Sequence, residues 1–161
     1  MTEKILILDF GSQYTQLIAR SVREAHVYCE IIPYHQKIIP DPSIKGIILS
    51  GSPSSVNDKG APVVDVKAFH ASLPILGICY GAQLTAREFG GKVASSSKRE
   101  YGRALLSKVK EDVLLQDVSN LSQVWMSHAD TILELPAGFD VLATTDSIPY
   151  AAFKNNGEGF P

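Results

Sequence analysis

The chain has 161 residues, of which 45% are hydrophobic and 20% are charged, and its formal net charge is -2. This length is enough for one domain with a sizeable core. Its 15 basic and 17 acidic residues are nearly balanced, which argues against a nucleic-acid or membrane surface, because phosphate binding needs clustered positive charge.

The first apolar run is interrupted by Asp9 and is too short for a signal peptide or a membrane span. Two cysteines, Cys29 and Cys79, cannot form a disulfide framework, so we expect free thiols in a reducing cytoplasm. The sequence has neither a C-x-x-C nor an H-E-x-x-H motif, and therefore predicts no metal site.

In the first half, short apolar runs alternate with segments of helical spacing. The runs predict strands at residues 4–9 ("KILILD"), 27–32 ("VYCEII"), 46–50 ("GIILS") and 74–79 ("PILGIC"). Helices are expected after the first strand, from Pro62 onward, and from Tyr80 to Phe89, where Gly90 ends the last one. This alternation predicts an α/β fold of flavodoxin-like, three-layer type, with a mostly parallel sheet and helices on both faces.

After Gly91 the pattern changes to strand-like runs separated by proline and glycine. These runs are "ALLSKV", "QVWMS", "TILEL", "FDVLAT" and "YAAFK". We interpret them as added, partly antiparallel strands of one domain that spans residues 1–161.

The segment Gly77-Ile78-Cys79-Tyr80-Gly81 has the form of a nucleophile elbow, with cysteine in the place of the nucleophile. Glycine suits both flanking positions, because side chains there would crowd the tight turn. The helix that follows presents its free N–H groups to Cys79, which predicts a lowered thiol pKa. Cys29 lies in mid-strand without glycine neighbours and is expected to be buried and inert.

Several stretches resemble the class I (triad) glutamine amidotransferases, and the resemblance runs essentially from end to end. The stretches are "ILDFGSQYTQLIAR", "IILSGSPSSV", "PILGICYGAQL", "REYGRA" and "VWMSHAD". The resemblance implies that Cys79 attacks the side-chain amide of L-glutamine and forms a thioester, with an oxyanion hole from the N–H groups of Gly51 and Tyr80. The implied glutamine-binding residues are Gly51, Ser52, Gln83, Ser127, His128, Ala129 and Asp130.

The first and last of these stretches favour relatives whose ammonia is used by a separate synthetase part. That part, an ATP-pyrophosphatase domain or subunit, is expected to need ATP and Mg²⁺. No Walker motif occurs in these 161 residues, so no cofactor is expected in this chain itself.

Two features depart from the class. The class has glycine at the position of Ala129, and its triad takes histidine and glutamate from a late His-Pro-Glu segment that is absent here. We therefore expect a domain that lacks its C-terminal segment and hydrolyses glutamine poorly by itself. Among the histidines, His26, His35 and His70 are expected at structural or surface positions. His128 is the one candidate for a base, although a substrate-binding role is favoured.

Two alternatives remain open from the sequence. "DFGSQYTQ" resembles a flavodoxin phosphate loop in which Ser12 and Thr15 would bind FMN phosphate, although Ser12 as a helix cap is favoured. The chain could also belong to the cysteine-elbow deglycases or peptidases of the same fold.

Overall fold

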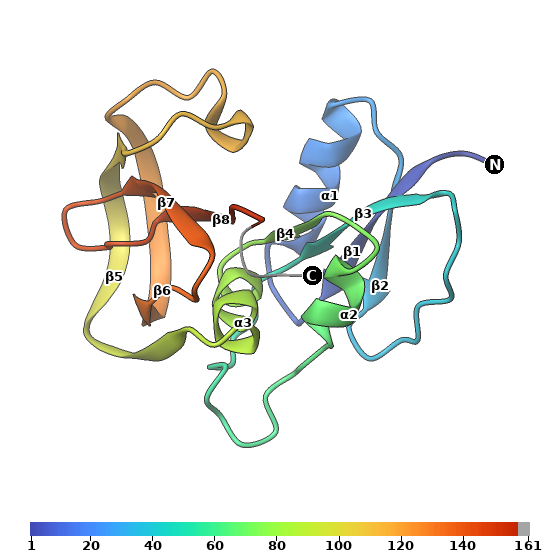
Figure 1. Ribbon diagram of the computed structural model, residues 1–161, viewed down its shortest axis with the longest axis horizontal. Helices are drawn as coiled ribbons and strands as arrows, with labels where there is room; N and C mark the ends of the chain where they lie inside the picture. Colours follow the sequence, from blue (N-terminus) through green and yellow to red (C-terminus); the bar gives the residue numbers. More distant parts are fainter. Residues whose placement is uncertain (158–161) are drawn as a thin grey trace. The chain divides into compact units, whose positions relative to one another are not determined.

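The computed structural model describes residues 1–157, together with their side chains except those of residues 97–100 and 128. The chain forms two compact units, Met1–Glu88 and Phe89–Pro161 (Figure 1).

The first unit is built on a four-stranded parallel sheet in the order β2-β1-β3-β4. Its strands are β1 (Lys4–Asp9), β2 (Cys29–Pro33), β3 (Ile44–Leu49) and β4 (Ile75–Gly77), and its helices are α1 (Thr15–Glu24), α2 (Val66–His70) and α3 (Tyr80–Glu88). Figure 1 shows α1 on one side of this sheet and α3 on the other. The prediction of an α/β fold with a parallel sheet and helices on both faces is confirmed.

The core between the sheet and α1 is a cluster of fully or almost fully buried apolar side chains. Ile7 of β1 and Ile48 of β3 pack there against Ala19 of α1 and Cys29 of β2. Leu6 and Leu8 alternate with Ile7 and are also buried, as expected of a strand covered on both faces. The Cys29 thiol is buried, as predicted.

Several predicted boundaries shift: β3 begins two residues earlier than expected, and β4 is shorter than residues 74–79. Two further shifts have a local reason. Strand β2 begins at Cys29 rather than Val27, because His26 takes a left-handed φ of 60° and the Val27 N–H bonds back to the Val22 carbonyl. Helix α2 begins at Val66 because the Asp65 carboxylate accepts the Ala68 N–H at 2.9 Å and caps the helix there. Pro62 therefore precedes the helix instead of opening it.

The second unit is an antiparallel sheet in the order β6-β5-β7-β8. It comprises β5 (Lys92–Lys108), β6 (Ser122–Glu134), β7 (Phe139–Thr144) and β8 (Ala152–Asn155), with a 3₁₀ turn, η1, at Val113–Leu115. "QVWMS" and "TILEL" belong to one strand, since neither proline nor glycine interrupts the residues between them. The antiparallel strands thus form a sheet of their own.

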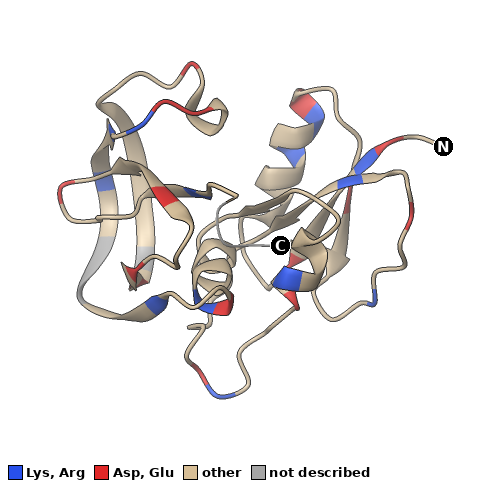
Figure 2. Cartoon of the chain, in the orientation of Figure 1, with Lys and Arg blue, Asp and Glu red and all other residues tan. Residues whose placement is uncertain are grey.

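No helix within residues 1–157 is long and apolar enough to cross a membrane. Figure 2 shows basic and acidic residues interspersed along the described parts of both units.

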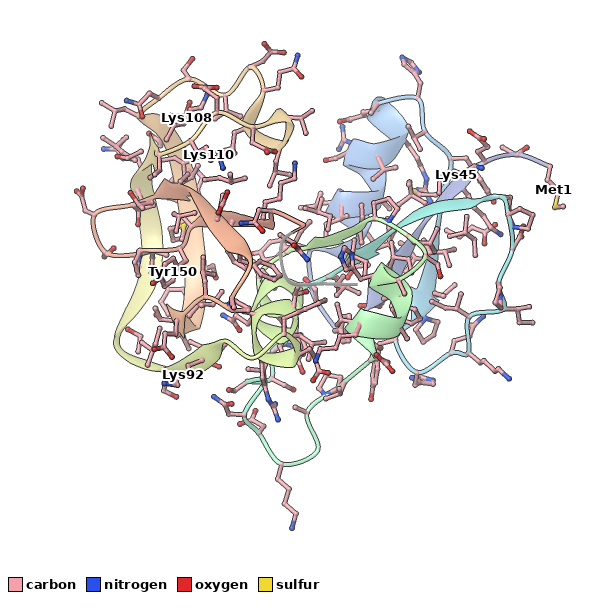
Figure 3. All side chains as sticks on the ribbon, viewed as in Figure 1. Met1, Lys45, Lys92, Lys108, Lys110 and Tyr150 are labelled. Carbon is pink, nitrogen blue, oxygen red and sulfur yellow. The ribbon has the colours of Figure 1, made fainter. Side chains whose placement is uncertain are left out.

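Charged side chains hold together the turn after β5 and the strands β7 and β8. Lys110, which follows the end of β5 by two residues and is labelled in Figure 3, pairs with Asp140 of β7, and Asn156 donates to the same carboxylate at 3.1 Å. Asp112 accepts the Leu114 N–H at 3.0 Å through one oxygen and Lys154 Nζ at 2.9 Å through the other.

These contacts favour the charged carboxylates. The Leu114 N–H and then Lys154 hold the pKa of Asp112 below its usual range. Lys110 and then Asn156 do the same for the pKa of Asp140.

A carboxylate whose pKa is lowered in the folded state stabilises the protein above its unfolded pKa, and this contribution is lost as pH falls through the folded pKa. Asp112→Asn keeps an oxygen that can cap η1 but removes the charge. We expect this variant to be less stable than the parent at neutral pH and to lose less stability between about pH 5 and pH 3. Urea unfolding followed by circular dichroism measures both, with Asp146→Asn as the control. Equal pH dependence in parent and D112N would contradict the assignment.

Candidate active site

The residues that follow β3 and β4 meet at the carboxyl edge of the parallel sheet. A Cβ atom placed on Gly51 would lie 3.6 Å from Cys79 Cβ and 3.3 Å from Ser12 Oγ. Gly51, Cys79 and Ser12 therefore come together where ligands bind in open α/β sheets. The structure thus brings Gly51 close to Cys79, as the predicted oxyanion hole requires.

Cys79 occupies the strained turn between β4 and α3. Its φ is 52°, in the left-handed region that non-glycine residues rarely adopt, and α3 begins at the next residue. Such a conformation costs on the order of 1–3 kcal/mol and persists only where the surrounding structure enforces it. The Cys79 side chain is exposed, so the turn presents the sulfur to solvent.

The glycines on either side of Cys79 are required by backbone packing. A Cβ on Gly77 would lie 2.6 Å from the Gly81 carbonyl oxygen, and one on Gly81 would lie 2.4 Å from the Leu49 carbonyl oxygen. The expected crowding of the tight turn is thus confirmed, and for Gly81 the clash is with the backbone of β3. Glycine lets the first turn of α3 lie directly against the backbone of β3 and β4.

Two backbone donors at this edge are free to bind a ligand. Within residues 1–157, neither the Gly51 N–H nor the Tyr80 N–H donates a hydrogen bond to another residue. Gly51 is buried and Tyr80 is only 2% exposed, and buried N–H groups are rarely left without a partner. Amides in such positions can receive negative charge that develops on a bound carbonyl.

The Tyr80 side chain and Arg87 fasten the segment after β3 onto α3. The Tyr80 hydroxyl donates to the Pro62 carbonyl at 2.5 Å, and Arg87 donates to the Val56 carbonyl. The Tyr80 ring also packs against Phe10 with ring centroids 5.5 Å apart. Burial raises the pKa of Tyr80 to about 12, so the hydroxyl remains a donor at physiological pH.

The thiol pKa differs from the sequence prediction. Desolvation by the surrounding atoms raises the pKa of Cys79, although the side chain reaches solvent. The N-terminus of α3 favours the thiolate, but one of its N–H groups, that of Gly81, already bonds to protein carbonyls. Desolvation therefore dominates, and the thiol needs a proton acceptor to become a nucleophile.

Gln83 follows the elbow closely in sequence, and Ser52 is the neighbour of Gly51, whose added Cβ would lie 3.6 Å from Cys79 Cβ. The Gln83 N–H donates to the Cys79 carbonyl at 3.0 Å, which places Gln83 one helical turn beyond the cysteine. The Ser52 hydroxyl accepts the Ser54 N–H at 3.2 Å and shapes the segment that follows Gly51. Their contacts with glutamine stay predictions.

The residues of "SHAD" lie in strand β6 of the second unit instead of the expected loop. Ser127 and Ala129 are exposed on one face of the strand, whereas Asp130 is buried on the other face. The side chain of His128 lies outside the described residues. The substrate-binding roles of these four residues stay predictions.

The segment after β1 does not have the arrangement of a phosphate loop. One Asp9 carboxylate oxygen accepts the Gly11 N–H at 2.9 Å and the Thr15 hydroxyl at 3.0 Å. A carboxylate thus occupies the donors that a phosphate would need, and its charge would repel a phosphate. The Ser12 hydroxyl accepts the Tyr14 N–H at 2.9 Å. Tyr14, not Ser12, is the cap residue of α1, so Ser12 stabilises the turn just before the helix.

The sequence predicts no role for Ser50, the last residue of the expected strand 46–50. The side chain is fully buried, and its hydroxyl accepts the Phe10 N–H at 3.0 Å and donates to the Gly51 carbonyl at 3.0 Å. The only sequence signal was its place between a buried strand and Gly51.

Comparison with protein families identifies the class. The family model "Glutamine amidotransferase class-I" matches residues 6–160, so the chain belongs to this family.

The curated relatives refine this assignment. The chain is 57% identical over 159 residues to "GMP synthase [glutamine-hydrolyzing]" of Cytophaga hutchinsonii, which covers 98% of this chain and 31% of that protein. The protein of the same name from Aquifex aeolicus is 50% identical over 153 residues, which cover 94% of this chain and 30% of that protein. The chain thus spans about a third of the length of these relatives.

Solved structures agree on the fold. A protein from Thermoplasma acidophilum, provisionally assigned as one subunit of GMP synthase, superposes with a TM-score of 0.87 at 27% identity over 98% of this chain and 80% of its own. A glutamine amidotransferase from Thermotoga maritima shares the fold at 18% identity, with a TM-score of 0.78 over 97% of this chain and 73% of its own.

The raised pKa of Cys79 predicts how its alkylation depends on pH. Only the thiolate reacts, so the labelling rate should rise with pH with a midpoint above that of a cysteine in a short unstructured peptide. Iodoacetamide labelling of the Cys29→Ser variant, followed by mass spectrometry across the alkaline range, measures this midpoint. A midpoint below that of the peptide cysteine would mean that the N-terminus of α3 outweighs desolvation.

Proposed function

We propose that this chain is the glutaminase part of a GMP synthase and that it releases ammonia from L-glutamine at Cys79. The observation that carries the proposal is an exposed cysteine in a strained turn, adjacent to Gly51 and followed by Tyr80, whose N–H groups are both unpaired within the described residues. Membership in the amidotransferase family and 57% identity to a GMP synthase over 98% of the chain support the choice of substrate.

The reaction begins when the Cys79 sulfur attacks the side-chain carbonyl carbon of glutamine. The electron pair of the C=O bond moves to oxygen, and the N–H groups of Gly51 and Tyr80 donate to this oxyanion. One such donor commonly contributes about 10²–10³ in rate. When the tetrahedral intermediate collapses, the C–N bond breaks, the nitrogen takes a proton and ammonia leaves. Water then hydrolyses the glutamyl thioester to glutamate and restores the thiol.

One group must accept the thiol proton, because the pKa of Cys79 is raised, and then donate a proton to the leaving nitrogen. The resemblance to the class implies that a histidine, oriented by a glutamate, transfers these protons. Both residues belong to a His-Pro-Glu segment that does not occur in these 161 residues. Slow hydrolysis by the 161-residue chain alone therefore stays a prediction.

The ammonia would be used by a synthetase part that activates XMP with ATP and Mg²⁺ and converts it to GMP. The relatives are about three times as long as this chain, which leaves room in them for such a part. A cytoplasmic location is consistent with this role, in which the thiol must remain reduced.

A diazoketone analogue of L-glutamine tests the substrate site. Protonation of its diazo carbon and displacement of N₂ by the Cys79 sulfur leave a stable thioether. We expect labelling of Cys79, detected by mass spectrometry, and slower labelling in the presence of excess L-glutamine. Cys29→Ser should label like the parent, and Cys79→Ser should not label. Labelling that glutamine leaves unchanged would refute the substrate assignment.

The synthetase role is tested with the whole protein that carries this chain. Cys79→Ala should abolish glutamine-dependent formation of GMP from XMP and leave ammonia-dependent formation within about twofold of the parent, because only the glutaminase step needs the thiol. An absorbance assay of XMP conversion with either nitrogen donor measures both rates. Glutamine-dependent activity that survives in C79A would contradict the proposal.

A further inference from the structure

The peptides on either side of Gly51 are each held by one hydrogen bond. The Ser50 carbonyl accepts the Gly81 N–H at 3.1 Å, and the Gly51 carbonyl accepts the Ser50 hydroxyl at 3.0 Å. The first bond is between backbone groups at the start of α3 and the end of β3. The second comes from a side chain that is fully buried.

The first of these bonds fixes the direction of the Gly51 N–H. The Ser50–Gly51 peptide is trans, and a trans peptide holds its carbonyl and its N–H on opposite sides. Once the Ser50 carbonyl is bonded to Gly81, the Gly51 N–H is directed to the other side of the peptide plane.

Gly51 itself does not resist rotation. Glycine has access to both signs of φ, so the peptide planes around it can turn at little cost unless other groups hold them. A residue with a side chain would restrict this rotation but has little space, because a Cβ at this position would lie 3.3 Å from Ser12 Oγ and 3.6 Å from Cys79 Cβ. The position therefore needs glycine for space and hydrogen bonds for rigidity.

The Ser50 hydroxyl makes two bonds within this framework. Besides donating to the Gly51 carbonyl, it accepts the Phe10 N–H at 3.0 Å and so ties the end of β1 to the segment after β3. Phe10 is 3% exposed, and its ring packs against Tyr80, the residue that carries the second free N–H. One buried hydroxyl thus connects the surroundings of both oxyanion donors.

We propose that Ser50 is a positioning residue. Its hydroxyl holds the Gly51–Ser52 peptide, which the Gly81 bond does not reach, and by fixing this second side of Gly51 it keeps the Gly51 N–H directed at the oxyanion. This inference rests on the proposed function, since the oxyanion is that of the glutaminase reaction. Ser50 touches neither substrate nor sulfur in this role, and it acts through the peptide of Gly51.

Ser50→Ala in the whole protein tests the proposal. We expect the kcat for glutamine hydrolysis to fall about 10- to 100-fold, part of the effect of losing one oxyanion donor, while KM changes by less than about threefold. The iodoacetamide labelling rate of Cys79 should stay unchanged, because alkylation builds no oxyanion. A merely structural defect that displaced the elbow would change labelling as well. Ser43→Ala, which truncates another buried serine at the opposite end of β3, is the matched control.

A measurement that does not depend on enzyme activity tests the role of Ser50 separately from the proposed glutaminase function. In the 161-residue chain labelled with ¹⁵N-glycine, the Gly51 amide should give one sharp resonance in the parent and in S43A. In S50A it should broaden or split, because the backbone is then held on one side of Gly51 only.

The outcomes are distinct. An active parent with an equally active S50A variant overturns the positioning role and leaves the proposed function intact. A whole protein that does not hydrolyse glutamine overturns the proposed function, and the Gly51 resonance then decides the role of Ser50. A single sharp resonance in S50A contradicts the proposal in either case.

Discussion

The site depends on one close approach of backbone to backbone, where the first turn of α3 lies against the end of β3. A Cβ on Gly81 would lie 2.4 Å from the Leu49 carbonyl oxygen, so only glycine permits this contact. The same approach lets the Gly81 N–H reach the Ser50 carbonyl at 3.1 Å and forces Cys79 into a φ of 52°. The strain at the cysteine and the orientation of the Gly51 amide thus have a common origin. The packing of α3 on β3 determines the backbone geometry at Cys79 and Gly51.

Electrostatics at the elbow are less favourable than the geometry. Desolvation raises the pKa of Cys79, so the turn exposes a thiol without ionising it. A thiol of this kind becomes a nucleophile when a base takes its proton. The amides of Gly51 and Tyr80, in contrast, have no protein partner within the described residues and need no such change.

Much of the fold follows from sequence patterns, because they report local physics. "KILILD" predicted β1 to the residue, since a short run of branched apolar residues ended by Asp9 has few alternatives. The elbow was found because glycines two residues on either side of a cysteine match few other structures. The boundaries at Val27 and Pro62 failed, since they depend on the left-handed turn at His26 and the side-chain cap at Asp65, which apolar spacing does not encode. The role of Ser50 was hidden because both of its partners, Phe10 and Gly51, become neighbours only when β1 and β3 pair.

The central claim is that the amides of Gly51 and Tyr80 together receive the oxygen of the glutamine side chain at Cys79. A crystal structure of the chain with the glutamyl thioester trapped on Cys79 examines it most directly. The account predicts that the thioester oxygen lies about 2.7–3.1 Å from both amide nitrogens. A thioester oxygen directed into solvent, or a Gly51 amide bonded to a protein carbonyl in that structure, would contradict it.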